Sequence, residues 1–480
     1  MGELFAWGHA HIGLALFIIL TANAILTASV ILLENREPEK SMAWFLALFF
    51  IPFLGFVLYL FFGHDWHKRS YKQRRLGLTL TAQRREEIRR LEERFAHVTP
   101  LERTLRLLDA NLTGQDPTEG NRVTILTDAH EKYPRLLAAL RAATHRIDIE
   151  YYLFRNDGIG KEIIAILKER AHAGVAVRFL IDGMGSLGFG AKRFLDMRAA
   201  GISCHYFSPL ITLFYFLKAN YRDHRKIVVI DDAVAFTGGI NIGDEYLGKS
   251  PRGRWRDTSV ELHGPCVAQL TALFEENWHR TTHEPRRTAI PESAMLPAGE
   301  TVDIVASGPD SRWHTIHQQY LALIHQARRR IRIQTPYFIP DESLSAALTL
   351  AALRGVDIEI MLPHKTDWPY LRWVAHTYLE DLLRAGVRVY EYQQGFLHTK
   401  AIIVDDVAAS VGTCNVDIRS LRLDFEVNLL LTGTHSIRHL TEDFERDLIQ
   451  CEEIRYGAFI ERPLRQRVLE SIARLISPLL

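Results

Sequence analysis

The chain has few cysteines and little net charge, and both shortages exclude classes of protein. Only 4 of its 480 residues are cysteines, scattered without C-x-x-C spacing, so neither a disulfide framework nor a zinc site is expected. Its formal net charge of +1 at pH 7 is not that of a dedicated nucleic-acid-binding protein. A nucleotide-binding loop is missing too, because residues 183–188 fit the letters G-x-G-x-x-G without a following nucleotide-binding helix.

The most informative feature present is a motif that occurs twice. The pattern H-x-K-x-x-x-x-D spans residues 224–231 and recurs at residues 398–405. In both copies a Gly follows fourteen residues after the His, and an Asn seventeen residues after it. The repeated residues are His224, Lys226, Asp231 and Asn241 in the first copy, and His398, Lys400, Asp405 and Asn415 in the second. The chain therefore carries one chemical half-site twice.

These residue types predict a two-step transfer of a phosphate ester. A neutral imidazole can act as a nucleophile and a protonated one as a general acid, so two histidines can divide one displacement into two easier steps. Lysine is a compact cation that suits phosphate oxygens. Residues i and i+2 of a strand face the same way, so each His and its Lys are expected to reach one pocket. The motif aspartates close strands, and we expect them to hold local backbone and the facing half together.

At these motifs the chain resembles the phospholipase D superfamily, and the strings at residues 220–226, 237–246 and 417–421 resemble the bacterial cardiolipin synthases. The resemblance implies that His224 attacks the phosphorus of one phosphatidylglycerol and that glycerol leaves. A second phosphatidylglycerol then resolves the phosphatidyl-histidine to give cardiolipin, with His398 as general acid and then base. The half-sites are too alike for the sequence to separate the two roles further.

The resemblance also implies the supporting residues. Those that would bind the phosphoryl oxygens are Lys226, Lys400, Asn241 and Asn415. Their charges and those of the histidines suffice, so no metal or other cofactor is implied. Asp257 and Glu426 match acids that orient the motif histidines of relatives, although a solvated surface acid remains the alternative. Where the family pattern has an Asn before Phe-Glu, this chain has Asp424, which Arg422 could pair.

The repeat extends beyond the motif. Residues 147–154 align with residues 331–338, and segments with helix-like apolar spacing follow each. Strands alternating with helices predict α/β units around a mostly parallel sheet. The resemblance implies two such lobes packed face to face as one pseudo-two-fold unit, with both histidines at the seam. Before its motif the first repeat is about eleven residues longer. This apolar segment, 208–218, is either a lip through which lipid enters or an ordinary buried helix.

Two long uncharged segments, residues 12–33 and 42–63, lie near the N-terminus. Each would be about 33 Å long as a helix, so a transmembrane hairpin is predicted. A cleaved signal peptide is the alternative for the first segment, although a basic region before it is missing. Five Lys and Arg residues crowd positions 68–75. By the positive-inside rule they place the large domain on the cytoplasmic face of the bacterial inner membrane.

The predicted organisation has six parts: a hairpin at 1–67, a charged connector at 68–118, the first repeat at 119–285, a linker at 286–300, the second repeat at 301–456 and an amphipathic helix at 457–480. Whether that last helix packs on its own domain or touches lipid stays open. The expected partners are phosphatidylglycerol, cardiolipin and the bilayer, with no nucleic acid. A phospholipase D or nuclease that uses water as acceptor, and a non-catalytic membrane scaffold, remain alternatives. The oligomeric state is also open.

Overall fold

The computed structural model describes the chain in segments. They are residues 21, 38–51, 55, 58, 59, 63, 82–96, 98–208, 220–250, 253–287, 289–291, 293–311 and 313–475. Much of the two expected membrane spans, and the segment 208–218 apart from residue 208, lie outside them. Within the described segments, we find no helix with the length and apolar character needed to cross a bilayer.

The chain divides into two compact units. One comprises Met1–Arg69 with Ile211–Asn220 and includes helix α2 (Pro38–Phe50). The other comprises Ser70–Leu210 with Tyr221–Leu480. This second unit contains both copies of the motif and all the strands described below.

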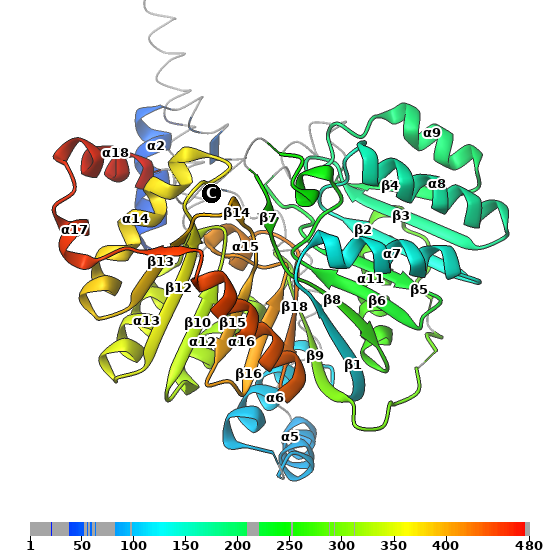
Figure 1. Ribbon diagram of the computed structural model, residues 1–480, viewed down its shortest axis with the longest axis horizontal. Helices are drawn as coiled ribbons and strands as arrows, with labels where there is room; N and C mark the ends of the chain where they lie inside the picture. The colour runs from blue at the N-terminus through cyan, green and yellow to red at the C-terminus, as the bar shows by residue number, and fades with distance from the viewer. Residues whose placement is uncertain are drawn as a thin grey trace, which may run out of the picture. The chain divides into compact units, whose positions relative to one another are not determined.

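The second unit is built on one sheet of 15 described strands whose two halves repeat the same order. From the shared edge outward, the first half runs β1 (Thr118–Leu126), β8 (Ser259–His263), β6 (Val234–Gly238), β5 (Lys226–Ile230), β2 (Arg146–Tyr151), β3 (Ala176–Asp182) and β4 (Ser203–Phe207). The second half runs β9 (Glu300–Ser307), β18 (Glu426–Leu431), β16 (Ala408–Gly412), β15 (Ala401–Val404), β10 (Arg330–Gln334), β12 (Asp357–Pro363), β13 (Arg388–Tyr392) and β19 (Cys451–Glu453). Figure 1 shows the halves joined where β1 and β9 pair antiparallel.

The expectation of a mostly parallel sheet is wrong. In the first half only β2, β3 and β4 pair parallel, while β2/β5, β5/β6, β6/β8 and β8/β1 are antiparallel. The second half repeats this mixture. The physical reason is the length of the connections, because a parallel pair needs a crossover of a dozen or more residues. The motif strand β5 turns into β6 within a few residues, and β15 turns into β16 in the same way.

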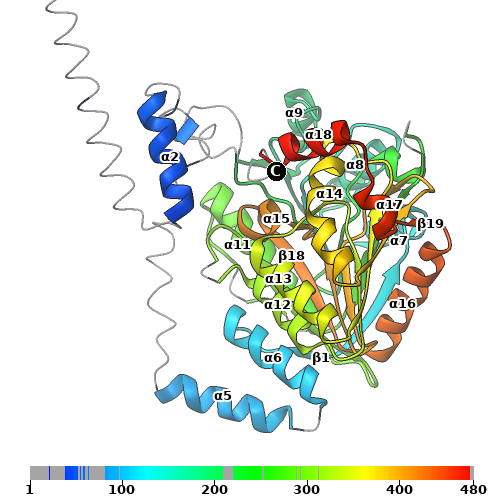
Figure 2. The ribbon, with the colours of Figure 1, turned by 90° about the vertical axis from the view of Figure 1, so that its left-hand side faces the viewer.

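Helices cover both faces of the sheet. The outer core of the first half contains side chains of α7 (Ala129–Ala142), α8 (Gly158–His172) and α9 (Ala191–Ala199). That of the second half contains side chains of α12 (Thr315–Gln326), α13 (Glu342–Leu353) and α14 (Pro369–Arg384). A third core cluster joins the halves, with Ile227 of β5 and Ile403 of β15 among the strand residues of both, together with α11 (Cys266–Thr282) and α16 (Thr434–Leu448). In Figure 2, α16 lies across the sheet from α12 and α13.

Part of the expected charged connector belongs to the second half. Helix α5 (Ala82–Arg94) has the exposed Arg–Glu pairs typical of a solvated helix, as between Arg89 and Glu86 at 2.9 Å. Helix α6 (Pro100–Thr113) differs, because its Leu105 is fully buried in the core that α12 and β9 form. A capping box between Thr99 and Glu102 begins this helix.

The motif aspartates hold local backbone, as expected, but among the described residues their carboxylates bond within their own repeat and not to the facing half. Asp231 follows β5 and its carboxylate accepts the N–H groups of Thr144, His145 and Arg146 at 2.7–2.8 Å. Asp405 follows β15 and accepts those of residues 328–330, each at 2.8 Å. Both have a left-handed backbone, with φ of 53° and 54°, which Asp tolerates better than most residues. Each aspartate thus fastens the start of a neighbouring central strand.

Replacing Asp405 with alanine should therefore destabilise the fold. Hydrogen bonds to a charged group contribute about 1.5–3 kcal/mol, so we expect Asp405→Ala to cost roughly 3 kcal/mol. The matched control is Asp406→Ala, because Asp406 also has a positive φ, 57°, but no comparable set of backbone donors among the described residues. Thermal unfolding in detergent should place the Tm of Asp405→Ala roughly 5 °C below that of the control. Equal values for the two variants would contradict the assigned role.

Candidate active site

Backbone hydrogen bonds join the segment of each motif histidine to a segment of the opposite half. The N–H of His224 donates to the carbonyl of Phe425 at 2.9 Å, and the N–H of Phe425 donates to the carbonyl of Arg222 at 2.8 Å. In the second copy, β14 (Phe396–Leu397) pairs parallel with β7 (Trp255–Arg256). The N–H of His398 then donates to the carbonyl of Arg256 at 2.7 Å. Each histidine is therefore held next to a strand of the other repeat.

As a result of these pairings, each motif histidine is bound by an acidic side chain of the other repeat, an arrangement called here the exchange of acids. Nδ1 of His224 lies 2.8 Å from Oε1 of Glu426, in the second half. Nδ1 of His398 lies 2.6 Å from Oδ2 of Asp257, in the first half. A carboxylate can only accept, so it keeps the ring proton on Nδ1 and leaves Nε2 as the nucleophilic or basic nitrogen. Sequence spacing does not indicate this exchange.

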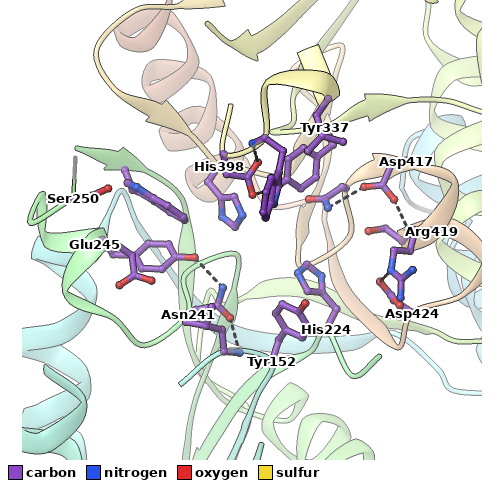
Figure 3. A pocket seen from close by; sticks show the side chains of 18 of the residues that line it. Tyr152, His224, Asn241, Glu245, Ser250, Tyr337, His398, Asp417, Arg419 and Asp424 are labelled. Atoms are coloured by element: carbon purple, nitrogen blue, oxygen red, sulfur yellow. Dashed lines mark hydrogen bonds and ion pairs between the residues drawn. The ribbon is translucent and has the colours of Figure 1, made fainter. Parts of the chain in front are cut away.

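Both histidines line a cavity of about 730 Å³ at the junction of the halves. Figure 3 shows the two rings facing a common space, with Asp417, Arg419 and Asp424 on the side of His224. Asn241 and Asn415 line the same cavity. The apolar and aromatic part of the wall consists of Tyr152, Leu153, Tyr246, Trp255, Tyr337, Ile339, Trp368, Tyr370 and Leu371. The cavity thus joins a polar end to an apolar wall.

The two asparagines are held in place by their own neighbours. The side-chain oxygen of Asn241 accepts the N–H of Leu153 at 3.3 Å, and its Nδ2 donates to the hydroxyl of Tyr246 at 2.8 Å. Nδ2 of Asn415 donates to Asp417 at 3.0 Å. Each amide nitrogen carries a second hydrogen that these bonds do not use, so both asparagines can donate to an anion in the cavity.

The motif lysines lie behind the histidines and are fully buried. Nζ of Lys226 donates to the carbonyl of His224 at 2.6 Å, and Nζ of Lys400 donates to that of His398. Burial lowers the pKa of Lys226 to about 7 and that of Lys400 to about 8, although Glu426 and Asp257 respectively favour the charged forms. Neither lysine is among the residues that line the cavity.

Burial and the lysines also keep the histidines neutral. Burial and Lys226 hold the pKa of His224 well below its ordinary value, and burial and Lys400 lower the pKa of His398 to about 4. The two acids differ. Burial raises the pKa of Glu426 to about 7, whereas Lys400 and His398 outweigh burial and hold the pKa of Asp257 below its ordinary value. The half-sites therefore match in geometry but not in charge.

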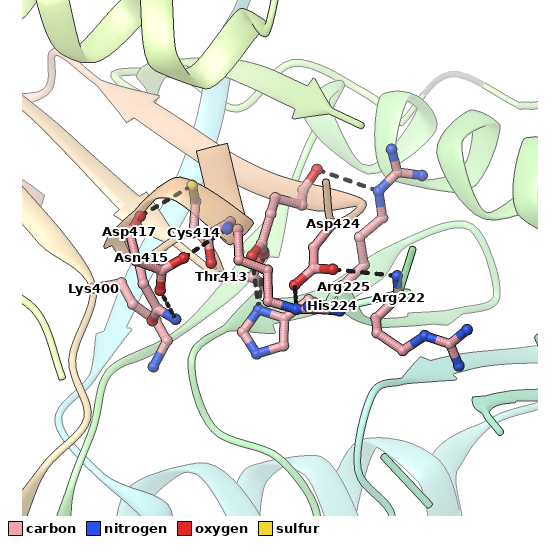
Figure 4. Close-up of polar contacts among 12 residues, drawn as sticks. Arg222, His224, Arg225, Lys400, Thr413, Cys414, Asn415, Asp417 and Asp424 are labelled. Carbon is pink, nitrogen blue, oxygen red and sulfur yellow. Dashed lines mark hydrogen bonds and ion pairs between the residues drawn. The ribbon is translucent and has the colours of Figure 1, made fainter. Parts of the chain in front are cut away.

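The additional acid Asp424 is part of the wall near His224. Arg419 forms an ion pair with it at 3.2 Å, while the expected partner Arg422 binds Asp341 at 2.8 Å. Its carboxylate also accepts the backbone N–H of Arg222 at 3.2 Å, a contact visible in Figure 4. Burial raises the pKa of Asp424 to about 7, so its charge near neutral pH is partial.

Sequence reasoning missed the aromatic side chains that surround the histidine rings, among them Phe396 at 5.5 Å from His398. Tyr152 meets the ring of His224 edge-on at a centroid distance of 4.9 Å. Trp255 and Tyr246 approach the ring of His398 at 5.4 and 6.0 Å. The aromatic residues next to the repeated strings were a signal, but aromatics are common in cores. Among the described residues, no group of three or more His, Cys, Asp or Glu side chains is arranged to hold a metal ion.

Two α/β halves, each providing one His-x-Lys half-site whose acid comes from the other half, define a phospholipase D-type unit. The family model described as a cardiolipin synthase, PLD-like domain matches residues 136–278 and 320–448, and one described as a phospholipase D-nuclease N-terminal region matches residues 21–64. The chain belongs to this family of PLD-like cardiolipin synthases.

The comparison with relatives covers nearly the whole chain. The major cardiolipin synthase ClsA of Bacillus subtilis is 40% identical over 477 residues, which are 97% of this chain and 98% of that protein. The cardiolipin synthase of Geobacillus kaustophilus is 40% identical over 469 residues, 96% of this chain and 93% of its own length. The solved structure of a phosphatidylserine synthase from Haemophilus influenzae superposes with a TM-score of 0.61 at 16% identity, covering 78% of this chain and 100% of that one. At that identity it supports the fold alone.

The buried lysines predict how anion binding depends on pH. Sulfate keeps the same charge between pH 6 and pH 9, while Lys226 and Lys400 lose their protons as the pH rises through about 7 to 8. Calorimetry should therefore show sulfate binding that weakens more than about tenfold over this range. The Lys400→Gln variant should bind sulfate more weakly than the unmodified protein at pH 6, and its affinity should depend less on pH. Lys249→Gln is the control, because Lys249 also lines the cavity but is exposed and paired with Asp244 at 3.1 Å. Affinity that stays constant with pH would contradict this account.

Proposed function

We propose that this chain is a phosphatidyltransferase that converts two molecules of phosphatidylglycerol into cardiolipin and glycerol. One observation carries the proposal: both motif histidines line one cavity, and each has its Nδ1 bound by a carboxylate of the opposite half. That arrangement supports a pair of imidazoles that can act in turn on one phosphorus atom. The family and its full-length relatives supply the substrate class.

In the first step, Nε2 of His224 attacks the phosphorus of one phosphatidylglycerol. A nitrogen–phosphorus bond forms, the bond from phosphorus to the glycerol oxygen breaks, and His398 gives its proton to that oxygen. The superfamily pattern favours this division of roles. In the ligand-free site His398 is neutral near pH 7, since its pKa is about 4. A phosphodiester anion in the cavity favours the imidazolium form, so substrate binding itself prepares the acid.

In the second step, neutral His398 takes the proton from a glycerol hydroxyl of the second phosphatidylglycerol. The hydroxyl oxygen attacks phosphorus, the bond to His224 breaks, and cardiolipin is released. Lys226 and Lys400 stabilise the charge on the transferring phosphoryl group from behind the rings. Asn241 and Asn415 donate hydrogen bonds to its oxygens. The motif aspartates support the same strands without touching the substrate.

The cavity walls support a lipid substrate. The polar end beside His224 suits the hydroxyl groups of a glycerol headgroup, because the buried carboxyl groups of Asp417 and Asp424 can accept hydrogen bonds there and the half-buried guanidinium of Arg419 can donate them. The apolar wall, which includes Ile339, Trp368 and Leu371, suits the carbon chains near the glycerol backbone. Trp368 is 60% exposed, as expected at an opening toward lipid.

We further propose that the N-terminal segment anchors the enzyme in the bacterial inner membrane as a two-helix hairpin, with the repeats on the cytoplasmic face. The uncharged segments 12–33 and 42–63 support the hairpin, as does the match of an N-terminal family model to residues 21–64. The proposed domains are the hairpin at 1–67, the connector at 68–118, the repeats at 119–285 and 301–456 about a linker at 286–300, and a terminal helix at 457–480.

Labelled phosphatidylglycerol tests the proposed reaction. The purified full-length enzyme in mixed micelles should release one glycerol for each cardiolipin formed, because the acceptor is a lipid hydroxyl. Thin-layer chromatography with mass spectrometry quantifies both products. Predominant phosphatidic acid would instead identify a hydrolase that uses water, and no turnover by well-folded protein would indicate a non-catalytic role.

The exchanged acids predict opposite kinetic defects in two conservative variants. Glu426→Gln should slow formation of the phosphatidyl-enzyme, because Glu426 holds His224, whereas Asp257→Asn should slow its breakdown, because Asp257 holds His398. Each should lower turnover by more than about tenfold with little change in Tm. Rapid-quench mass spectrometry would find little labelled enzyme in the first variant and accumulated label in the second.

The control for both variants is Asp381→Asn, whose side chain is 84% exposed and which should behave as the unmodified enzyme. The reverse pattern of label would exchange the roles of the histidines. Normal turnover in either variant would remove that acid from the site.

A further inference from the structure

The last described helix presents an apolar stripe to solvent. Helix α18 (Leu464–Arg474) repeats apolar residues at helical spacing, which leaves open from sequence alone whether the stripe faces the protein or lipid. The structure settles the direction. Leu464, Val468, Ile472 and Leu475 are 74%, 48%, 57% and 79% exposed. A continuous apolar stripe of this kind on the surface is a feature that needs a partner.

The opposite side of α18 is firmly attached to the domain. Glu470 and Ala473 are buried against α14. Glu470 accepts from Nδ1 of His376 at 2.9 Å and from the guanidinium of Arg462 at 3.1 Å. The helix is therefore held by buried polar contacts on one side, and its exposed stripe is fixed in direction.

The charge on the exposed side has one sign. Between Leu464 and Leu475 the sequence contains Arg465, Arg467 and Arg474, all exposed, and Glu470 as its single acid, which is 2% exposed. Among the described residues, neither Arg467 nor Arg474 forms an ion pair. Apolar side chains flanked only by arginines are complementary to an anionic, partly apolar surface.

A cavity of about 370 Å³ lies between α14 and α18, beside the stripe. Its lining residues are His376, Thr377, Glu380, Arg462, Arg467, Glu470, Ser471 and Arg474. Arg467 and Arg474 provide cationic donors, and Thr377 and Ser471 provide hydroxyl groups. Glu470 is already neutralised by Arg462 and His376, while Glu380 forms an ion pair with Arg384 at 3.2 Å. The cavity therefore suits a group with several acceptor oxygens, such as a phosphate ester.

Through its buried side, α18 is continuous with the packing that lines the catalytic cavity. Ala473 of α18 belongs to a small core cluster with Ile339, Leu371 and Val374. Ile339 and Leu371 also line the catalytic cavity, and the exposed Trp368 precedes α14 at its rim. Helix α18 packs on α14, and Figure 1 shows it at the same end of the sheet as β14 and β7, which flank His398 and Asp257. A surface that contacts α18 is thus placed next to the substrate opening.

We propose that this face of α18 docks on an anionic phospholipid surface, with the stripe in the interfacial layer and the α14/α18 cavity around the phosphate of one headgroup. A bilayer fits better than a protein because the exposed charged residues of α18 are all arginines, which complement an anionic surface. The argument from continuity rests on the proposed function. The arginines and the exposed stripe stand independently of it.

Lipid-quenching of a fluorescent label tests the docking directly. The starting protein is the full-length chain with Cys451→Ser, because its other cysteines are buried. A single cysteine is added to it and labelled with an environment-sensitive dye, and the labelled protein is placed in nanodiscs. Val468→Cys and Ile472→Cys report on the stripe. Leu353→Cys is the matched control, because Leu353 is 70% exposed but ends α13 at the other end of the sheet. The nanodiscs contain phosphatidylcholine carrying a bromine-labelled acyl chain, alone or in an equal mixture with phosphatidylserine.

We expect quenching at residues 468 and 472 to exceed that at residue 353 by at least about twofold in the anionic mixture, and to fall in phosphatidylcholine alone. Adding Arg467→Gln and Arg474→Gln should remove this dependence on phosphatidylserine. Equal quenching at all three positions would overturn the proposal. A stripe label that is shielded from aqueous iodide but not quenched by lipid would also overturn it, showing that protein covers the stripe. Quenching without cardiolipin formation would refute the proposed function alone.

Discussion

Two hydrogen bonds between a histidine and a carboxylate of the opposite half are the contacts on which the rest of the site depends. His224 takes its acid from the second repeat and His398 from the first, at 2.8 and 2.6 Å. These bonds fix the proton on Nδ1 of both rings and free both Nε2 atoms for one phosphorus. The antiparallel β1/β9 pair and the shared core supply the rigidity that holds the four groups in register.

Burial gives this site its electrostatic character. Two lysines with pKa values of about 7 and 8 lie behind histidines that are neutral near pH 7. In the proposed reaction, these lysines and histidines can each gain a proton when a phosphodiester anion binds. In that reaction, the phosphate of the substrate raises the pKa of His398 and so increases the protonated fraction of the acid that serves its own leaving group. Burial thus keeps the histidines neutral until the substrate binds, and the charge of the substrate then favours their protonated form.

The sequence predicted which residues form the site better than it predicted which of them bind one another. Repetition placed both His and both Asn residues on one cavity wall, because a duplicated fold gives duplicated positions. The alternation of side chains along a strand predicted that the lysines would lie in that wall too. In the structure, each Nζ instead donates to the carbonyl of the histidine two residues earlier. The exchange of acids could not be read from spacing, since it depends on pairing between segments 202 and 141 residues apart. The short β5/β6 and β15/β16 connections did contain the signal for antiparallel strands.

The exchange of acids between the two halves limits which substitutions such a chain can tolerate. Neither repeat holds a complete histidine–acid couple, so a substitution in one copy is felt as a defect in the chemistry of the other. The outer helices are released from this dependence, because each packs on its own half. The two copies can therefore differ at their periphery without affecting each other, while the residues at the seam can change only in a coordinated way.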